Sequence, residues 1–289
     1  MTALAAAQRL KDYALLMRLH RPIGSLLLLW PTLWALWFAA DGVPDGYILT
    51  VFVLGVFLMR SAGCVINDYA DRAFDPHIAR TRDRPIAAGR VKPGEAIALF
   101  VVLCLLGLAL VLTLNRLTVW LAFVGAFLAT TYPFLKRWTH LPQFYLGVAF
   151  GWGIPMAFAA QTGAVPPLAW VLLAANICWA VAYDTAYAMA DRADDLKVGV
   201  KSMAILVGAY DRLTVGLFHA AALALLAAAG AIAGRGILYY SGLALAGALA
   251  AHQQARIRTR APEACFRAFL DNNRFGAVIF LGLVLDYYG

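Results

Sequence analysis

YILTVFVLGVFLMRSAGCVI, residues 47–66, is an apolar run in which Arg60 is the single charged residue. A transmembrane helix needs about 20 mostly apolar residues to cross the hydrocarbon core of a bilayer. The run is therefore long enough to span a membrane as one helix. Unpaired backbone groups are not tolerated in lipid, so a spanning segment of this kind is expected to be helical.

Eight further apolar blocks accompany this run along the chain, at residues 22–40, 96–114, 117–135, 143–161, 168–190, 213–233, 237–253 and 273–288. Of the 289 residues, 63% are hydrophobic and 14% are charged, whereas average soluble domains have roughly 45–50% and 25%. Such a composition leaves too little polar surface for a water-soluble globule. We therefore predict an all-α membrane protein with nine transmembrane helices and a single domain over residues 1–289.

The basic residues predict the orientation of these helices, because Lys and Arg accumulate in cytoplasmic loops. With the N-terminus in the cytoplasm, one side of the membrane holds all of the 24 Lys and Arg residues except Arg116 and Arg235. The net charge of +8 is divided among short islands between apolar blocks. A nucleic-acid partner would need a continuous basic face, so none is predicted.

An aspartate-rich motif, NDYADRAFD, follows the second apolar block at residues 67–75. At about 100° per residue, positions four and eight apart return to one side of a helix. Asn67, Asp71 and Asp75 are therefore predicted to form one stripe of oxygen ligands at the cytoplasmic end of this helix.

A second aspartate-rich motif, YDTAYAMADRADD, occupies residues 183–195 after the sixth block. Asp184, Asp191 and Asp195 differ by seven and eleven positions, which again returns them to a single helical face. Asp194 points elsewhere and is the weaker candidate. The sequence thus predicts two carboxylate clusters at the same membrane depth.

Clustered carboxylates repel one another, so each cluster requires positive charge nearby. Mg²⁺ prefers oxygen ligands and typically binds one or two carboxylates together with substrate phosphates. Each motif therefore suits one Mg²⁺ that bridges to a diphosphate, and the alternatives are a Ca²⁺ site or a purely structural ion-pair network. The basic residues suited to neutralise the remaining phosphate charge are Arg72, Arg80, Arg82, Arg84, Lys136, Arg137, Arg192, Lys197 and Lys201.

An allylic diphosphate loses its leaving group when cations stabilise the charge that develops on the departing oxygen. A phenol ring then attacks the allylic cation through the carbon ortho to its hydroxyl. Because water would intercept the cation, the reaction needs a dry apolar cavity, which a helical bundle in lipid supplies. The two motifs in this setting therefore suit prenyl transfer from an allylic diphosphate.

The candidate substrate contacts are ionisable or aromatic residues beside the two motifs. Arg60 lies on nearly the same helical face as Asn67 and would be costly facing lipid, so it either binds the acceptor's carboxylate or pairs with a motif aspartate. Residues at the end of the fourth block either bind substrate or mark the membrane boundary, and the tyrosines of the second motif either line the site or pack. The candidates are Arg60, Arg72, Tyr132, Lys136, Arg137, Asp184 and Tyr187.

The motifs and the flanking segments LLLLWPTLWAL, MRSAGCVINDYADR, YPFLKRWTHLPQ and GWGIPMAFAA resemble the UbiA superfamily of intramembrane prenyltransferases, from about Arg18 to the C-terminus. The resemblance implies a nine-helix ring around a central cavity that opens to the cytoplasmic side of a bacterial inner membrane. It also implies Mg²⁺ as cofactor. The residues that match the family's metal-binding motifs are Asn67, Asp71, Asp75, Asp191 and Asp195, and the four aspartates among them are the catalytic candidates.

Within this family the resemblance is greatest to enzymes that transfer a long polyprenyl group to 4-hydroxybenzoate in ubiquinone synthesis. It implies polyprenyl diphosphate, 4-hydroxybenzoate and membrane lipid as partners, without predicting an oligomeric state. Segments at about 67–95 and 191–212 are expected to cap the site. The alternatives are another aromatic acceptor, such as a naphthoate or haem, and a membrane transporter, although transport sites usually lie nearer the bilayer midplane.

Overall fold

The computed structural model describes residues 3–78 and 81–289, and this described part is helical and contains no strand. The long helices are α2 (Ile23–Ala40), α3 (Gly46–Ala70), α4 (Pro93–Val111), α5 (Arg116–Leu135), α8 (Pro167–Val198), α10 (Asp211–Ile232), α11 (Ile237–Arg256) and α12 (Pro262–Tyr288). The shorter ones are α1 (Ala3–Leu16), η1 (Asp75–His77), α6 (Pro142–Gly151), α7 (Gly153–Thr162), α9 (Met203–Val207), η2 (Gly208–Tyr210) and η3 (Ile257–Thr259). The predicted all-α membrane fold is confirmed.

The predicted count of nine spanning helices is not confirmed, because 7 helical segments of the described chain are long and apolar enough to cross a membrane. The predicted block at 143–161 is divided between α6 and α7, which meet at Trp152. Pro155 explains the break, since its ring would clash with the carbonyl of Gly151 in a continuous helix. The block at 237–253 forms α11, whose last residues include His252, Gln253, Gln254 and Arg256, all of which are polar.

Two helices, α8 and α12, extend furthest beyond the apolar blocks from which they were predicted. α8 runs on from residue 190 to Val198 and ends at Gly199, whose φ of 73° is the left-handed conformation that terminates many helices. α12 begins at Pro262, where proline's missing N–H costs nothing. Both extensions contain charged residues, so a search for apolar blocks does not include them.

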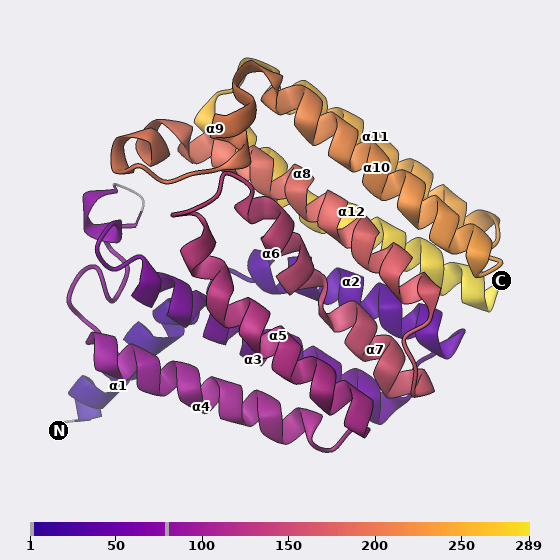
Figure 1. The fold of residues 1–289 in the computed structure, drawn as a ribbon, viewed down its shortest axis with the longest axis horizontal. Coiled ribbons are helices and arrows are strands. Elements are labelled where there is room, and N and C mark those ends of the chain that lie inside the picture. The colour runs from indigo at the N-terminus through magenta and orange to yellow at the C-terminus, as the bar shows by residue number, and fades with distance from the viewer. Residues whose placement is uncertain (1–2, 79–80) are drawn as a thin grey trace.

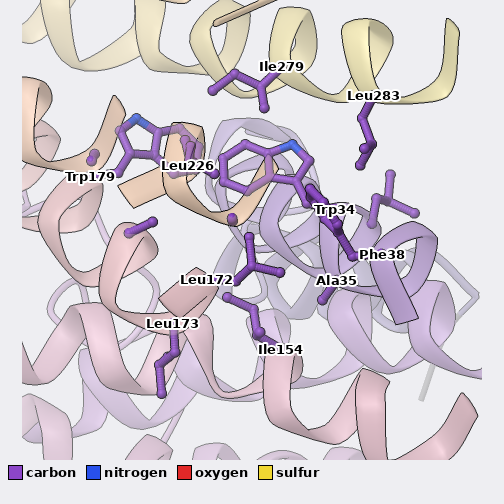
Figure 2. Packing of buried hydrophobic residues seen from close by; sticks show 14 of the residues in the cluster. Trp34, Ala35, Phe38, Ile154, Leu172, Leu173, Trp179, Leu226, Ile279 and Leu283 are labelled. Carbon is purple, nitrogen blue, oxygen red and sulfur yellow. The ribbon is translucent and has the colours of Figure 1, made fainter. Parts of the chain in front are cut away.

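Apolar side chains of α2, α8 and α12 pack together in the core, among them Trp34, Trp179 and Ile279 (Figure 2). The ring of Trp179 lies 5.3 Å from that of Trp34 and 5.5 Å from that of Phe275, centroid to centroid. Lipid is as apolar as these side chains, so tight van der Waals packing rather than exclusion from water holds such helices together. The packing makes α8, which carries the second motif, a rigid central element.

A buried polar cluster, defined by Trp179, His219, Gln253 and Asn272, joins α8, α10, α11 and α12. The Oδ1 of Asn272 accepts a hydrogen bond from Nε1 of Trp179 at 2.8 Å and lies 3.2 Å from Nε2 of His219. The Nδ2 of Asn272 donates to Oε1 of Gln253 at 3.0 Å. The cluster thus connects four helices through buried hydrogen bonds.

The two motif-bearing segments lie at one end of the helical bundle. Figure 1 shows the segment after α3 and the α9 segment at the same end, and the C-terminus at the other. At the opposite end Arg235 pairs with Asp41 at 3.1 Å, and its guanidinium carbon lies 3.9 Å from the centroid of the Tyr287 ring. The motifs therefore share one end of the molecule, as their position in the sequence predicted.

Candidate functional site

The first motif lies at the end of α3. Asn67 is in the last turn of the helix, which ends at Ala70, and Asp71 is the C-terminal cap residue. The chain then continues as turns, and the N–H of Asp75 donates to the carbonyl of Asp71 at 2.9 Å. The predicted helical stripe therefore ends before Asp75, but the turn still places Asp75 on the same cavity as Asn67 and Asp71.

The second motif lies within one continuous helix, because α8 extends past it to Val198. Asp184, Asp191 and Asp195 accordingly share a face, as their spacing predicted, and all three line the cavity. Asp194 also reaches the cavity wall, where its carboxylate accepts a hydrogen bond from Nζ of Lys197 at 2.9 Å. The second motif thus keeps its predicted helical geometry.

Both motifs border one cavity of about 760 Å³. The carboxylates lie along one part of its wall, and apolar residues of α2, α3, α4 and α6 form another, among them Leu27, Phe52, Met59, Leu108, Leu146 and Phe150. A volume of this order accommodates a drug-sized ligand or larger. The cavity therefore combines a charged region with an apolar one, as a diphosphate with a hydrocarbon tail requires.

Most of the predicted substrate contacts also line this cavity: Arg60, Tyr132, Lys136, Asp184 and Tyr187. Arg72 and Arg137 are not among the lining residues. Arg72 donates to the carbonyl of Tyr69 at 2.8 Å, and Arg137 donates to the carbonyl of Ala70. In this structure the two arginines therefore satisfy carbonyl groups at the end of α3, and their contact with substrate stays a prediction.

Basic side chains pair with the acids of the first motif. Lys136, which directly follows α5, contacts Asp71 at 2.5 Å, and Arg84 contacts Asp75 at 2.8 Å. The Oδ2 of Asp71 also accepts a hydrogen bond from Nδ2 of Asn67 at 3.2 Å. The acids of the first motif are thus paired with basic side chains that also line the cavity.

Asp68 is a part of the site that sequence reasoning missed. It is buried, and it pairs with Arg84 at 3.0 Å and with Arg18 at 2.5 Å. Asp68 is one residue off the predicted stripe, and Arg18 lies before α2, far away in sequence. The position of Asp68 inside the motif was the one available signal, because the contact with Arg18 arises from tertiary packing.

The carboxylates of the first motif are suited to bind a further positive charge. Burial raises the pKa of Asp75, the charges of Asp71 and Asp68 raise it further, and the guanidinium of Arg84 opposes this rise. The Oδ1 of Asp71 is buried and has no hydrogen-bond partner. A carboxylate oxygen in such a position is suited to a hard cation.

Within residues 3–78 and 81–289, no three His, Cys, Asp or Glu side chains are arranged so that they could hold a metal ion by themselves. Mg²⁺ commonly takes one or two carboxylates and completes its coordination with water and substrate phosphates. The unpartnered oxygen of Asp71, the all-oxygen donor set and the second carboxylate cluster across the cavity fit that mode of binding.

The chain is similar to known proteins both in sequence and in structure. The UbiA prenyltransferase family matches residues 28–281. A "4-hydroxybenzoate octaprenyltransferase" of Alkalilimnicola ehrlichii is 59% identical over 288 residues, covering 100% of this chain and 98% of the relative. The apo structure of a UbiA homolog from Aeropyrum pernix K1 is 25% identical, with a TM-score of 0.81 over 91% of this chain and 97% of that one. A UbiA homolog from Archaeoglobus fulgidus, bound to DMAPP and Mg²⁺, is 17% identical, with a TM-score of 0.73 over 94% and 99% of the two chains.

Proposed function

Because the chain belongs to the UbiA prenyltransferase family, we propose that it transfers a long polyprenyl group from polyprenyl diphosphate to 4-hydroxybenzoate. The product is 3-polyprenyl-4-hydroxybenzoate, a precursor of ubiquinone, and the second product is diphosphate. The observation that carries the proposal is the meeting of both aspartate motifs on one partly apolar cavity. The identity of 59% to a 4-hydroxybenzoate octaprenyltransferase supports this choice of acceptor.

The charged part of the cavity holds the diphosphate. Asn67, Asp71 and Asp75 on one side and Asp191 and Asp195 on the other are the proposed ligands of Mg²⁺. When bound, Mg²⁺ supplies Lewis-acid stabilisation of the departing diphosphate. The magnesium-bound state of the Archaeoglobus fulgidus homolog is consistent with this assignment.

Basic residues of the same wall contact the phosphate oxygens that the metal leaves free. Lys136 and Arg84 both line the cavity, and each is held in place by a motif aspartate. Lys201 lines it as well and donates from Nζ to the carbonyl of Trp138 at 3.2 Å. Charge-assisted hydrogen bonds from such groups stabilise the leaving group as its negative charge develops.

The apolar part of the cavity excludes water from the allylic cation and accommodates the isoprenyl tail. Arg60 on α3 is the proposed partner of the acceptor's carboxylate, and Tyr132, Asp184 and Tyr187 line the space in which the acceptor's ring would lie. Attack by the ring carbon ortho to the hydroxyl forms the new carbon–carbon bond. Loss of the ring proton then restores aromaticity.

Two segments are proposed to cap the site. In the segment at about 67–95, Thr81 and Arg84 line the cavity, whereas residues 79–80, and with them Arg80, lie outside the described residues. In the segment at about 191–212, the N–H of Lys201 donates to the carbonyl of Lys136 at 3.0 Å. Both segments therefore contact the end of the cavity at which the motifs lie.

We expect the purified protein, supplied with Mg²⁺ and a polyprenyl diphosphate, to prenylate 4-hydroxybenzoate. Incubation with a panel that also contains a dihydroxynaphthoate, haem and 4-hydroxybenzamide, followed by mass spectrometry of the products, tests this expectation. Prenylation of the naphthoate or of haem alone would assign a different acceptor. Failure to prenylate any acceptor, together with uptake of a solute into vesicles, would favour a transporter.

The multi-pass chain is proposed to lie in a bacterial inner membrane, with its N-terminus and both motifs facing the cytoplasm. The distribution of Lys and Arg supports this orientation. In a chain whose own cysteines are replaced by alanine, a cysteine at position 289 should react with an impermeant maleimide from the periplasmic side. Labelling from the cytoplasmic side alone would contradict the predicted topology.

A further inference from the structure

We infer that Gly24 sets the position of the Arg60 guanidinium and thereby the selection of an acceptor that carries a carboxylate, an inference that rests on the proposed function. Gly24 is the second residue of α2, it is buried, and it lines the cavity together with Arg60. A Cβ added at Gly24 would lie 2.6 Å from Cζ of Arg60 and still closer to its Nε and Nη2. The guanidinium therefore occupies the space that any other side chain at position 24 would fill.

The backbone itself does not call for glycine at this position. Gly24 lies within α2, and it is not among the glycines whose φ is positive. Alanine is the better helix former, so the helix alone gives no advantage to glycine here. The close approach of Arg60 is the feature of the structure that accounts for it.

The surroundings of Arg60 indicate what the guanidinium is placed to bind. Its Cζ lies 5.9 Å from the centroid of the Phe150 ring on α6. No carboxylate of the described residues forms an ion pair with it, whereas Lys136 and Arg84 are each paired with motif aspartates. An arginine within a spanning helix needs a partner, and the planar guanidinium matches a carboxylate with two parallel hydrogen bonds.

Three helices thus fix one charged group. Arg60 extends from α3, Gly24 on α2 leaves the space for it, and Phe150 on α6 lies beside it. A methyl group at position 24 would push the guanidinium off this position without removing its charge. The predicted consequence is weaker binding of the acceptor, with diphosphate binding unaffected, because the three atoms nearest to a Cβ at Gly24 all belong to Arg60.

The test measures KM and kcat for wild type, Gly24→Ala, Arg60→Ala and the double variant, at saturating Mg²⁺. Gly24→Ala should raise KM for 4-hydroxybenzoate by about tenfold, the effect of losing one charged hydrogen bond, and should leave KM for polyprenyl diphosphate unchanged. In the Arg60→Ala background, Gly24→Ala should have no further effect. Rates with 4-hydroxybenzamide, which has no carboxylate, should not respond to Gly24→Ala.

Gly55→Ala is the matched control, because Gly55 also lines the cavity and a Cβ there meets nothing within 4 Å. Its KM for 4-hydroxybenzoate should stay close to the wild-type value. If Gly24→Ala alone does not yield folded protein, recovery of folding in the double variant supports the steric coupling, and failure of both variants overturns it.

Absence of 4-hydroxybenzoate prenylation by the wild type would contradict the proposed function. Wild-type activity combined with an unchanged KM in Gly24→Ala would instead overturn the role of Gly24 alone. Additive losses in the double variant would do the same, because they would show that Gly24 acts independently of Arg60.

Discussion

Asp71→Asn is expected to lower kcat for prenyl transfer by about 10²-fold or more, while the protein stays folded in detergent. The substitution replaces a carboxylate whose Oδ1 is buried without a partner by a neutral amide of nearly the same shape. The amide oxygen can still accept a hydrogen bond from Lys136, so packing at the end of α3 is retained. Steady-state rates at equal amounts of monodisperse protein measure the effect.

Asp191→Asn should cause a loss of similar size, because it changes the second carboxylate cluster of the same cavity. Asp194→Asn is the matched control, since Asp194 pairs with Lys197 and its side chain is 43% exposed. The control removes the same charge from a neighbouring position on α8. Equal losses in Asp191→Asn and Asp194→Asn would show that net charge, rather than the position of the carboxylate, determines the rate.

Removal of divalent metal with EDTA is expected to abolish prenyl transfer, and Mg²⁺ in excess should restore it. Asp68, Asp71 and Asp75 lie on the cavity, and their basic neighbours Lys136 and Arg84 are already engaged with them. A diphosphate entering without metal would therefore meet carboxylates whose neutralisation is incomplete. The measurement is the initial rate before chelation, after chelation and after re-addition of metal.

Full activity after exhaustive chelation would contradict the assignment of the motifs as Mg²⁺ ligands. A thermal unfolding midpoint that does not change on chelation would show that the lost rate is not caused by unfolding. Restoration by Ca²⁺ but not by Mg²⁺ would favour the alternative cation. Mg²⁺ is expected to be the better of the two because it binds together with substrate phosphates.

The second motif was predictable in detail because its geometry is local. From Pro167 to Val198 the chain has no interior Gly or Pro, so α8 stays regular and Asp184, Asp191 and Asp195 return to one face. The first motif was predictable in its residues but not in its shape. α3 ends at Ala70, and nothing in NDYADRAFD marks that end by a Gly or Pro, since the next proline is Pro76.

Contacts between distant segments were beyond sequence reasoning. Spacing along one helix cannot show that Arg18 pairs with Asp68, or that Gly24 makes room for Arg60, because both contacts depend on how the chain from Arg18 into α2 packs against α3. The break between α6 and α7 differs from these. The sequence indicates this break by Gly151, Gly153 and Pro155. A count of apolar residues does not detect it, because such a count takes no account of helix-breaking residues.

The buried polar cluster around Asn272 has a consequence for how the protein is made. Trp179, His219 and Gln253 enter the membrane during synthesis before α12 does, and each contacts Asn272 in the finished bundle. A polar group without a partner is unfavourable in lipid. The polar side chains of the earlier helices therefore lack one hydrogen-bond partner until α12 inserts. We therefore expect a chain cut short before α12 to leave Trp179, His219 and Gln253 in the membrane without Asn272 as a partner.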